Sequence, residues 1–264
     1  MIERIERIAA LLLATSFALT CLACAEGPTP EAQSAPPAAL PSDDHPDRPE
    51  GMPEDMPSGM PEGINDTFLS EEMDVSHWVE RFEGESREVY ANRRAIVEAL
   101  ELSEGSRVAD IGAGTGFFTV LFAERVGPDG EVYAVEVSPK FLEHLRERAT
   151  TEELESVQVV EGTQTSVELP ENSVDIAFVC DVYHHFESPE ASLASLMSAI
   201  RPGGSLVIIE FDRIPGVSPD WLIEHVRAGR EVFTAEIESA GFRLAEEIEI
   251  DGLKDNYVLR FERP

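Results

Sequence analysis

From residue 87 to its end, the chain alternates strand-like and helix-like segments, and this alternation limits the fold more than any other feature. Short apolar segments bounded by turn residues predict five strands: Arg107–Ile111, Glu131–Val137, Val157–Val160, Val174–Cys180 and Ser205–Phe211. Helical patterns lie before and between them, at Arg87–Leu100, Gly116–Val126, Pro139–Ala149, Pro189–Ile200 and within residues 219–240. Strands separated by helices form a mostly parallel sheet with helices on both faces. The sequence therefore predicts a doubly wound α/β fold.

The end of the chain departs from this alternation. Polar and apolar residues alternate over Phe242–Ile250, and a turn at Asp251-Gly252 separates that segment from Tyr257–Glu262. Two strand patterns joined by a short turn predict a hairpin. We therefore expect an antiparallel C-terminal hairpin at the sheet.

The charge of the chain excludes several classes of partner. The 264 residues include 52 Asp and Glu but only 20 Lys and Arg, for a formal net charge of −32. Sequence-independent binding to nucleic acids depends on Lys and Arg contacts to phosphate, so we expect no nucleic-acid partner. A basic helix that lies on a membrane surface is equally unsupported. Hydrophobic residues make up 42% of the chain, which is enough to bury a core.

Residues 1–25 have the pattern of a signal peptide. The apolar run Ile8–Leu19 is too short to span a bilayer as a helix but has the length of a signal-peptide core. The segment then reaches Cys24, which resembles the lipidated cysteine of a bacterial lipoprotein, although Cys21 stands where that pattern has Leu. Ala23 and Ala25 equally fit ordinary signal-peptidase cleavage, and a cytoplasmic protein with an apolar start is the third alternative. We predict an exported protein of the periplasm or cell envelope, anchored by a lipid on Cys24.

Residues 26–65 are rich in Pro and acidic residues, and Met-Pro recurs at Met52, Met56 and Met60. Such a composition cannot bury enough apolar surface to offset chain entropy, so we predict a disordered linker to a folded domain at residues 66–264. Copper binding by the methionines is the alternative, but the tract contains no His near them.

A glycine-rich loop follows the first predicted strand. The residues Asp110-Ile111-Gly112-Ala113-Gly114-Thr115-Gly116 lead directly into a helix, and glycines there let the backbone approach a ligand. Glu136 ends the next strand, where an acidic residue accepts hydrogen bonds from ribose hydroxyls. The dinucleotide pattern needs a further glycine where this chain has Phe117. A nucleoside cofactor without phosphate, such as S-adenosylmethionine, therefore fits better than a dinucleotide.

Four segments in order resemble the class I S-adenosylmethionine-dependent methyltransferases. These are VADIGAGTGFFT, EVYAVEVSP, SVDIAFVCDVYHHF and IRPGGSLVIIEF, and the similarity covers roughly Ser86 to Arg263. The resemblance implies a Rossmann-like doubly wound sheet and S-adenosylmethionine as cofactor. It is strongest for the small-molecule methyltransferases, because the chain has no large target-recognition domain.

The resemblance also implies roles for single residues in cofactor binding. Asp110 would orient the methionine amino group or support the loop, Gly112 and Gly114 would line the methionine and ribose, and Glu136 would bind the ribose hydroxyls.

The same resemblance implies contacts after the third and fourth strands. Many family members have an Asp near the end of the third strand for adenine; here Thr163 or Gln164 has to serve. Asp181 and Val182 would lie beside the cofactor. All of these positions follow successive strands, where open α/β sheets bind their ligands.

The segment Tyr183-His184-His185 follows the fourth strand, where the transferred methyl group should lie. A histidine there is a candidate general base near neutral pH, and Tyr183 is a candidate for contact with the sulfonium. The alternative is that these side chains cap the loop and pack on the sheet. No third ligand stands at a recognisable spacing from the two histidines, so we predict no metal.

Two further segments keep two interpretations each. Glu85 and Arg87 either cover the carboxylate of the cofactor or form a solvated charge pair. Residues 210–213, which follow the fifth strand, either shape the acceptor pocket or form a solvated loop.

The leading functional hypothesis is methyl transfer from S-adenosylmethionine to a small molecule. The alternative is a non-catalytic lipoprotein that binds a nucleoside or metabolite on the same scaffold, because this cofactor is made in the cytosol. A nicotinamide oxidoreductase is disfavoured by Phe117. We expect a small-molecule substrate that is not a polyanion, and membrane contact only through a lipid on Cys24.

Overall fold

The computed structural model describes residues 63–264, so the predicted signal peptide and nearly all of the predicted linker lie outside the described residues. A turn at Gly63–Asn65 leads into the first helix. The helices are α1 Asp66–Leu69, α2 Val75–Phe82, α3 Glu88–Ala91, α4 Arg93–Ala99, α5 Phe117–Val126, α6 Pro139–Thr151, the 3-10 turn η1 Tyr183–His185, α7 Pro189–Ala199, α8 Asp220–His225 and α9 Arg230–Ser239.

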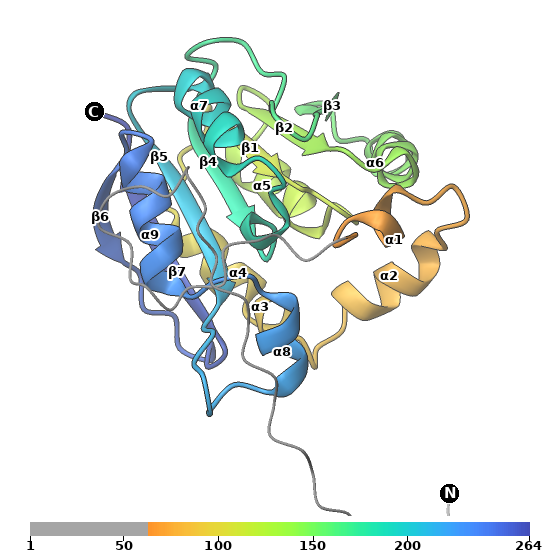
Figure 1. Ribbon diagram of the computed structural model, residues 1–264. Helices are drawn as coiled ribbons and strands as arrows, with labels where there is room; N and C mark the ends of the chain where they lie inside the picture. Colours follow the sequence, from red (N-terminus) through yellow and green to blue (C-terminus); the bar gives the residue numbers. More distant parts are fainter. Residues whose placement is uncertain (1–62) are drawn as a thin grey trace, which may run out of the picture. The chain divides into compact units, whose positions relative to one another are not determined.

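Seven strands form one sheet in the order β3-β2-β1-β4-β5-β7-β6. They are β1 Arg107–Ile111, β2 Glu131–Glu136, β3 Val157–Glu161, β4 Val174–Cys180, β5 Ile200–Phe211, β6 Arg243–Glu247 and β7 Asn256–Glu262. The first five are parallel, β7 pairs antiparallel with β5, and β6 pairs antiparallel with β7 (Figure 1). The predicted doubly wound α/β fold with its antiparallel C-terminal hairpin is confirmed.

Two apolar layers hold helices to the two faces of the sheet. On one face, α4 and α5 pack on strand residues that include Val108 and Phe178. On the other face, α7 and α9 pack on the alternate residues, among them Ala109 and Val179. Successive side chains of a strand point to opposite faces, so β1 and β4 contribute to both layers and are apolar almost throughout. Helices thus cover both faces of the sheet, and ligands can approach it only at the ends of its strands.

Two predicted helices are each broken in two. The segment predicted as one helix at residues 87–100 is α3 and α4, with Asn92 between them. The region between residues 219 and 240 is α8 and α9, separated by Val226–Gly229, where Val226 is buried in the core. Helical periodicity continues across such breaks because the apolar residues on either side still face the same core.

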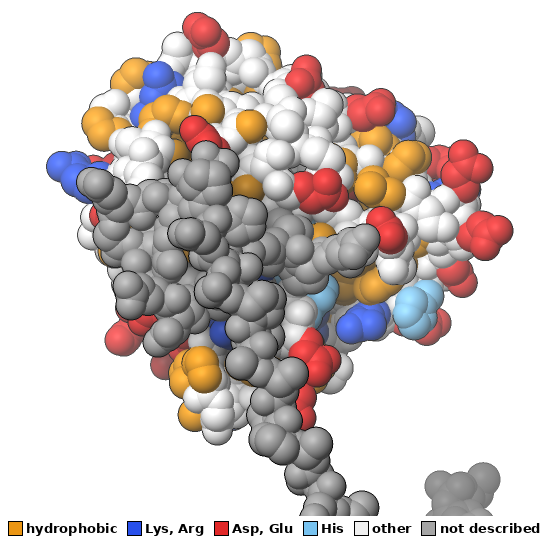
Figure 2. Space-filling model, viewed as in Figure 1, with side chains coloured by type: hydrophobic (Ala, Val, Ile, Leu, Met, Phe, Trp, Pro, Cys, Tyr) orange, Lys and Arg blue, Asp and Glu red, His pale blue; other side chains and the backbone are white. Residues whose placement is uncertain are grey.

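Acidic side chains are spread over the visible face of the domain and do not gather in one patch (Figure 2). None of the helices within residues 63–264 has the length and apolar character needed to cross a membrane.

The buried layer predicts a matched pair of valine substitutions. Val207 on β5 is fully buried, whereas Val217 is 76% exposed. Val207→Ala should lower the free energy of unfolding by about 2 kcal/mol, because it removes buried methyl groups and leaves a cavity. Val217→Ala should change it by less than about 0.5 kcal/mol. Urea denaturation of both variants measures the difference, and equal losses would contradict this assignment of the core.

Candidate functional site

A cavity of about 860 Å³ lies at the carboxyl ends of the parallel strands. The chain leaves β1 toward β2 on one side and returns through β4 on the other, so the crevice beside these two strands is the switch point of the sheet. The loops after β1, β2, β3 and β4 line the cavity, and helices α1 and α2 cover it. Its volume lies within the usual range for ligand sites in proteins.

The glycine loop after β1 is shaped by close contacts that only glycine permits. Gly112 has φ +66°, and a Cβ there would lie 2.5 Å from Cγ1 of Val182. Gly116 has φ +82°, and a Cβ there would lie 2.6 Å from Cδ2 of Leu145 on α6. The positive φ and the close approach of a neighbouring side chain together exclude a residue larger than glycine at both positions. The loop therefore brings bare backbone to the cavity wall, as the sequence predicted.

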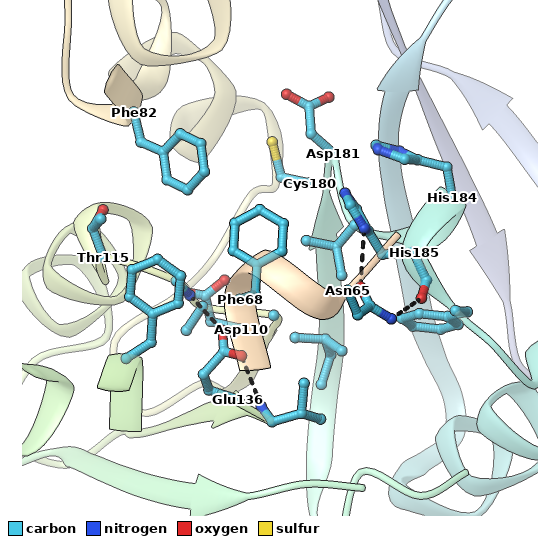
Figure 3. A pocket seen from close by; sticks show the side chains of 18 of the residues that line it. Asn65, Phe68, Phe82, Asp110, Thr115, Glu136, Cys180, Asp181, His184 and His185 are labelled. Atoms are coloured by element: carbon cyan, nitrogen blue, oxygen red, sulfur yellow. Dashed lines mark hydrogen bonds between the residues drawn. The ribbon is translucent and has the colours of Figure 1, made fainter. Parts of the chain in front are cut away.

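Two buried carboxylates flank this loop (Figure 3). Asp110 on β1 accepts a hydrogen bond of 2.6 Å from the hydroxyl of Thr119, and burial raises its pKa to about 7. Glu136 accepts from the backbone N–H of Gly114 at 2.9 Å, of Val137 at 2.7 Å and of Ser138 at 2.9 Å. Burial raises the pKa of Glu136, and the three N–H groups oppose that rise. Glu136 is thus held rigidly against the glycine loop.

The other predicted cofactor residues also line this cavity. Thr163 and Gln164 follow β3, and Asp181 and Val182 follow β4. The structure thus brings together all eight positions that the sequence assigned to the cofactor.

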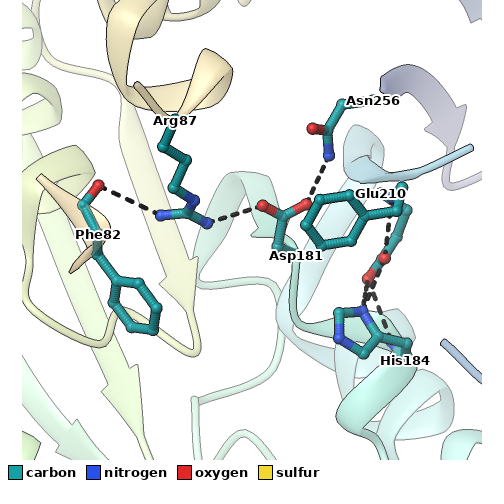
Figure 4. Close-up of polar contacts among 7 residues, drawn as sticks. Phe82, Arg87, Asp181, His184, Glu210 and Asn256 are labelled. Atoms are coloured by element: carbon teal, nitrogen blue, oxygen red, sulfur yellow. Dashed lines mark hydrogen bonds and ion pairs between the residues drawn. The ribbon is translucent and has the colours of Figure 1, made fainter. Parts of the chain in front are cut away.

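Asp181 is part of a polar network that reaches the N-terminal part of the domain (Figure 4). Its carboxylate accepts from Nη2 of Arg87 at 2.7 Å and from Nδ2 of Asn256 at 2.6 Å. Burial raises the pKa of Asp181, and the charge of Arg87 opposes that rise. Arg87 is therefore not a solvated pair with Glu85, which instead contacts Arg93 at 3.1 Å, and Arg87 lines the cavity.

Helices α1 and α2, here called the cover helices, place aromatic rings over the cavity. The rings of Phe68 and Trp78 lie 4.8 Å apart, and those of Trp78 and Phe82 lie 5.1 Å apart. The hydroxyl of Ser138 donates to the backbone oxygen of Phe68 at 2.6 Å. Nη1 of Arg148 donates to Glu83 at 2.7 Å and to the backbone oxygen of Thr115 at 2.9 Å, which ties the cover helices to the glycine loop.

The three residues of the predicted catalytic segment have different surroundings. His184 is buried, and its Nδ1 lies 2.8 Å from Oε2 of Glu210 on β5. His185 lines the cavity beside it. Tyr183 does not line the cavity: its hydroxyl donates to Glu236 at 2.8 Å, and its ring packs on Phe233 in the core. The structure therefore leaves Tyr183 without a place in the chemistry, because the 3-10 turn directs it to the opposite side.

Three residues of the site were not predicted from the sequence. Asn65 holds His185, His225 ends α8 beside both histidines, and Asn256 binds Asp181. They come from distant segments whose local sequence indicates only a turn, a helix end or a strand start. Glu210 belongs to the segment 210–213 that the sequence offered for the acceptor pocket, and its buried carboxylate binds His184.

Comparisons with known proteins agree with this geometry. Residues 109–208 match the family described as Methyltransferase domain. The ubiquinone/menaquinone biosynthesis C-methyltransferase UbiE of Ectopseudomonas mendocina is 31% identical over 47% of this chain and 48% of its own length. The demethylmenaquinone methyltransferase of Listeria monocytogenes is 26% identical over 47% of this chain and 53% of its own length. The chain thus spans about half the length of the curated relatives it matches.

Solved structures share the fold more widely. A SAM-dependent methyltransferase from Aquifex aeolicus superposes with a TM-score of 0.61 at 25% identity, over 71% of this chain and 97% of that chain. The [4+2]-cyclase SpnF superposes with a TM-score of 0.57 at 16% identity, over 66% of this chain and 81% of that chain, and shows the fold alone. The methyltransferase matches favour an enzyme over the non-catalytic binding protein.

The raised pKa of Asp110 predicts how stability depends on pH. The folded protein holds the proton of Asp110 up to a pKa of about 7, whereas the ordinary value is 3.8. The folded state therefore binds more protons between these values, and Asp110 lowers stability as pH rises through that window. Asp110→Asn removes this titration. Between about pH 4 and about pH 7, the free energy of unfolding of this variant should therefore fall by less than that of the wild type, with a difference of up to about 4 kcal/mol.

Urea denaturation at several pH values measures this difference. Asp129→Asn, at an exposed position, is the matched control and should follow the wild type. Parallel curves for Asp110→Asn and the wild type would show that Asp110 ionises normally in the folded state.

Proposed function

We propose that this chain, which has the domain, fold and cofactor type of an S-adenosylmethionine-dependent methyltransferase, methylates a small, largely apolar aromatic molecule that carries a hydroxyl group. One observation supports this most directly. A single cavity joins the glycine loop and Glu136 at one end to the histidines and aromatic rings at the other (Figure 3). Methyl transfer requires donor and acceptor in line and in contact, and a shared cavity provides that arrangement.

The residues at the first end fit the cofactor. Glu136 is positioned by three backbone N–H groups, so its carboxylate is fixed before a ribose arrives. The glycine loop offers backbone where a side chain would fill the space, and Asp110 lies beside it for an ammonium group. S-adenosylmethionine supplies a methyl group on a positively charged sulfur, and the aromatic rings of the cover helices favour such a charge.

The residues at the second end indicate the acceptor. Phe211 and Trp221 line this end with their rings 5.6 Å apart, and Phe68 and Trp78 face it from the cover helices. Such walls accommodate a flat apolar molecule, and the imidazoles of His184 and His185 offer polar contacts to its hydroxyl group. One named relative is a C-methyltransferase of ubiquinone/menaquinone biosynthesis and the other a demethylmenaquinone methyltransferase, which supports an apolar acceptor that contains a ring. The net charge of −32 favours a neutral or cationic acceptor.

Catalysis in this proposal depends mainly on positioning. Arg87 donates to the backbone oxygen of Phe82 on α2 at 3.5 Å and to Asp181, which also accepts from Asn256, so this network links the cover helices to the strand ends. His184 is oriented by Glu210, so a hydrogen-bonding nitrogen is presented to the acceptor without a change of conformation.

Cofactor binding tests the proposal. Calorimetry on the full chain should detect binding of S-adenosylmethionine and of its demethylated product. Glu136→Gln should weaken both affinities by at least about ten-fold, because it removes a charged hydrogen-bond acceptor for the ribose. Glu161→Gln is the matched control, since Glu161 is exposed at the equivalent position of β3 and should leave the affinity unchanged. A wild-type chain that binds neither molecule would overturn the proposed function.

The cellular location is a separate part of the proposal and rests on the sequence alone. We propose export and a lipid on Cys24, supported by the apolar run that precedes it. In a bacterial host, the wild type should incorporate labelled palmitate, Cys24→Ser should lose the label, and Cys21→Ser should retain it. A label that persists in Cys24→Ser would contradict lipidation at this residue.

A further inference from the structure

Three histidines meet at the acceptor end of the cavity. His184 and His185 come from the turn after β4, and His225 is the last residue of α8. One ring nitrogen from each lies within 4.8 Å of the others. The ring centres of His184 and His185 lie 4.3 Å apart, and that of His225 lies 5.0 Å and 5.1 Å from them. All three side chains line the cavity.

The protonation of His184 follows from its partner. Its Nδ1 faces both oxygens of Glu210, at 2.8 and 3.0 Å, and a carboxylate accepts hydrogen bonds. Nδ1 therefore carries the hydrogen, and the neutral ring has its lone pair on Nε2. That Nε2 atom is buried and has no hydrogen-bond partner within residues 63–264. A buried nitrogen without a partner is costly, so it indicates a missing ligand.

His185 is oriented in the same way by Asn65. The amide nitrogen of Asn65 donates to the backbone oxygen of His185 at 3.0 Å and to Glu187 at 2.8 Å. The amide oxygen is therefore the atom that lies 3.1 Å from Nδ1 of His185, and it accepts from that nitrogen. Nε2 of His185 is left with its lone pair. A hydrogen bond from the second nitrogen to an oxygen is the arrangement that orients histidine ligands at metal sites.

We propose that His184, His185 and His225 bind one zinc ion. Three imidazoles with an open fourth position form the ligand set typical of catalytic zinc. Zn–N bonds of about 2.1 Å separate tetrahedral ligands by about 3.4 Å, so ring nitrogens that lie within 4.8 Å of one another need to approach by up to about 1.4 Å. Glu210 adds a negative charge behind His184, which strengthens that ligand. The strongly acidic chain also attracts cations.

The three ligand side chains line the acceptor end of the cavity, and this gives the ion a role that rests on the proposed function. A hydroxyl oxygen of the acceptor takes the open position and releases its proton to water, because a bound zinc ion lowers the pKa of such a group. The resulting oxyanion is the activated form of a hydroxylated aromatic molecule. Zinc binding itself requires no cofactor and no acceptor.

The test uses the full chain after treatment with a chelator and its removal. Calorimetric titration with Zn²⁺ alone should give one ion per chain, and Co²⁺ should give the visible absorption of a tetrahedral site. His225→Ala should weaken Zn²⁺ binding by at least about 100-fold and remove the Co²⁺ bands. His185→Gln is a second ligand variant with the same expectation.

His77→Ala is the matched control, because His77 is an exposed histidine on α2 and does not line the cavity. It should bind Zn²⁺ like the wild type. Affinity for S-adenosylmethionine, measured on the metal-free wild type and on His225→Ala, should be the same and shows that the variant is folded. A wild type that binds no Zn²⁺ while binding S-adenosylmethionine overturns the metal site and leaves the proposed function standing. Zn²⁺ binding that survives both ligand substitutions overturns it equally.

Discussion

Four carboxylates are buried at the carboxyl ends of adjacent strands. The rest of the site depends on which groups donate hydrogen bonds to each of them. Glu136 on β2, Asp110 on β1, Asp181 after β4 and Glu210 on β5 follow the strand order. A buried charge without a partner would cost more than the fold can supply. Each carboxylate therefore recruits donors, and these donors belong to the segments that form the cavity.

The hydrogen-bond donors to these carboxylates differ in kind, and this difference distinguishes the two ends of the cavity. Backbone N–H groups hold Glu136, and the hydroxyl of Thr119 serves Asp110, so this half is formed by glycines and a helix start. Side chains serve the other two: Arg87 binds Asp181, and His184 binds Glu210. The first half suits a nucleoside and an amino acid. The second half has imidazoles and aromatic rings, which suit a less polar molecule.

Much of this could be predicted from local sequence, because local sequence determines strand ends and tight turns. Asp110 and the glycines stand directly after a strand, and Glu136 ends the next, so parallel pairing alone brings them to one edge. His184 and His185 follow β4 and reach the same edge for the same reason. Tyr183 belongs to that segment as well, yet its ring lies in the core, because one residue of displacement in a 3-10 turn redirects a side chain by about 120°.

The sequence by itself determined the fold class, the glycine-rich loop, the cofactor type and the strand ends at which the cavity lies. These follow from the period of apolar residues and from backbone conformations that only glycine adopts. Only the tertiary structure decided which side chains meet there. Asn65 and His225 lie 120 residues before and 40 residues after His185 in the chain, and packing of α1 and α8 brings them into contact with it. Such contacts depend on how whole helices pack on the sheet, so the local sequence pattern does not predict them.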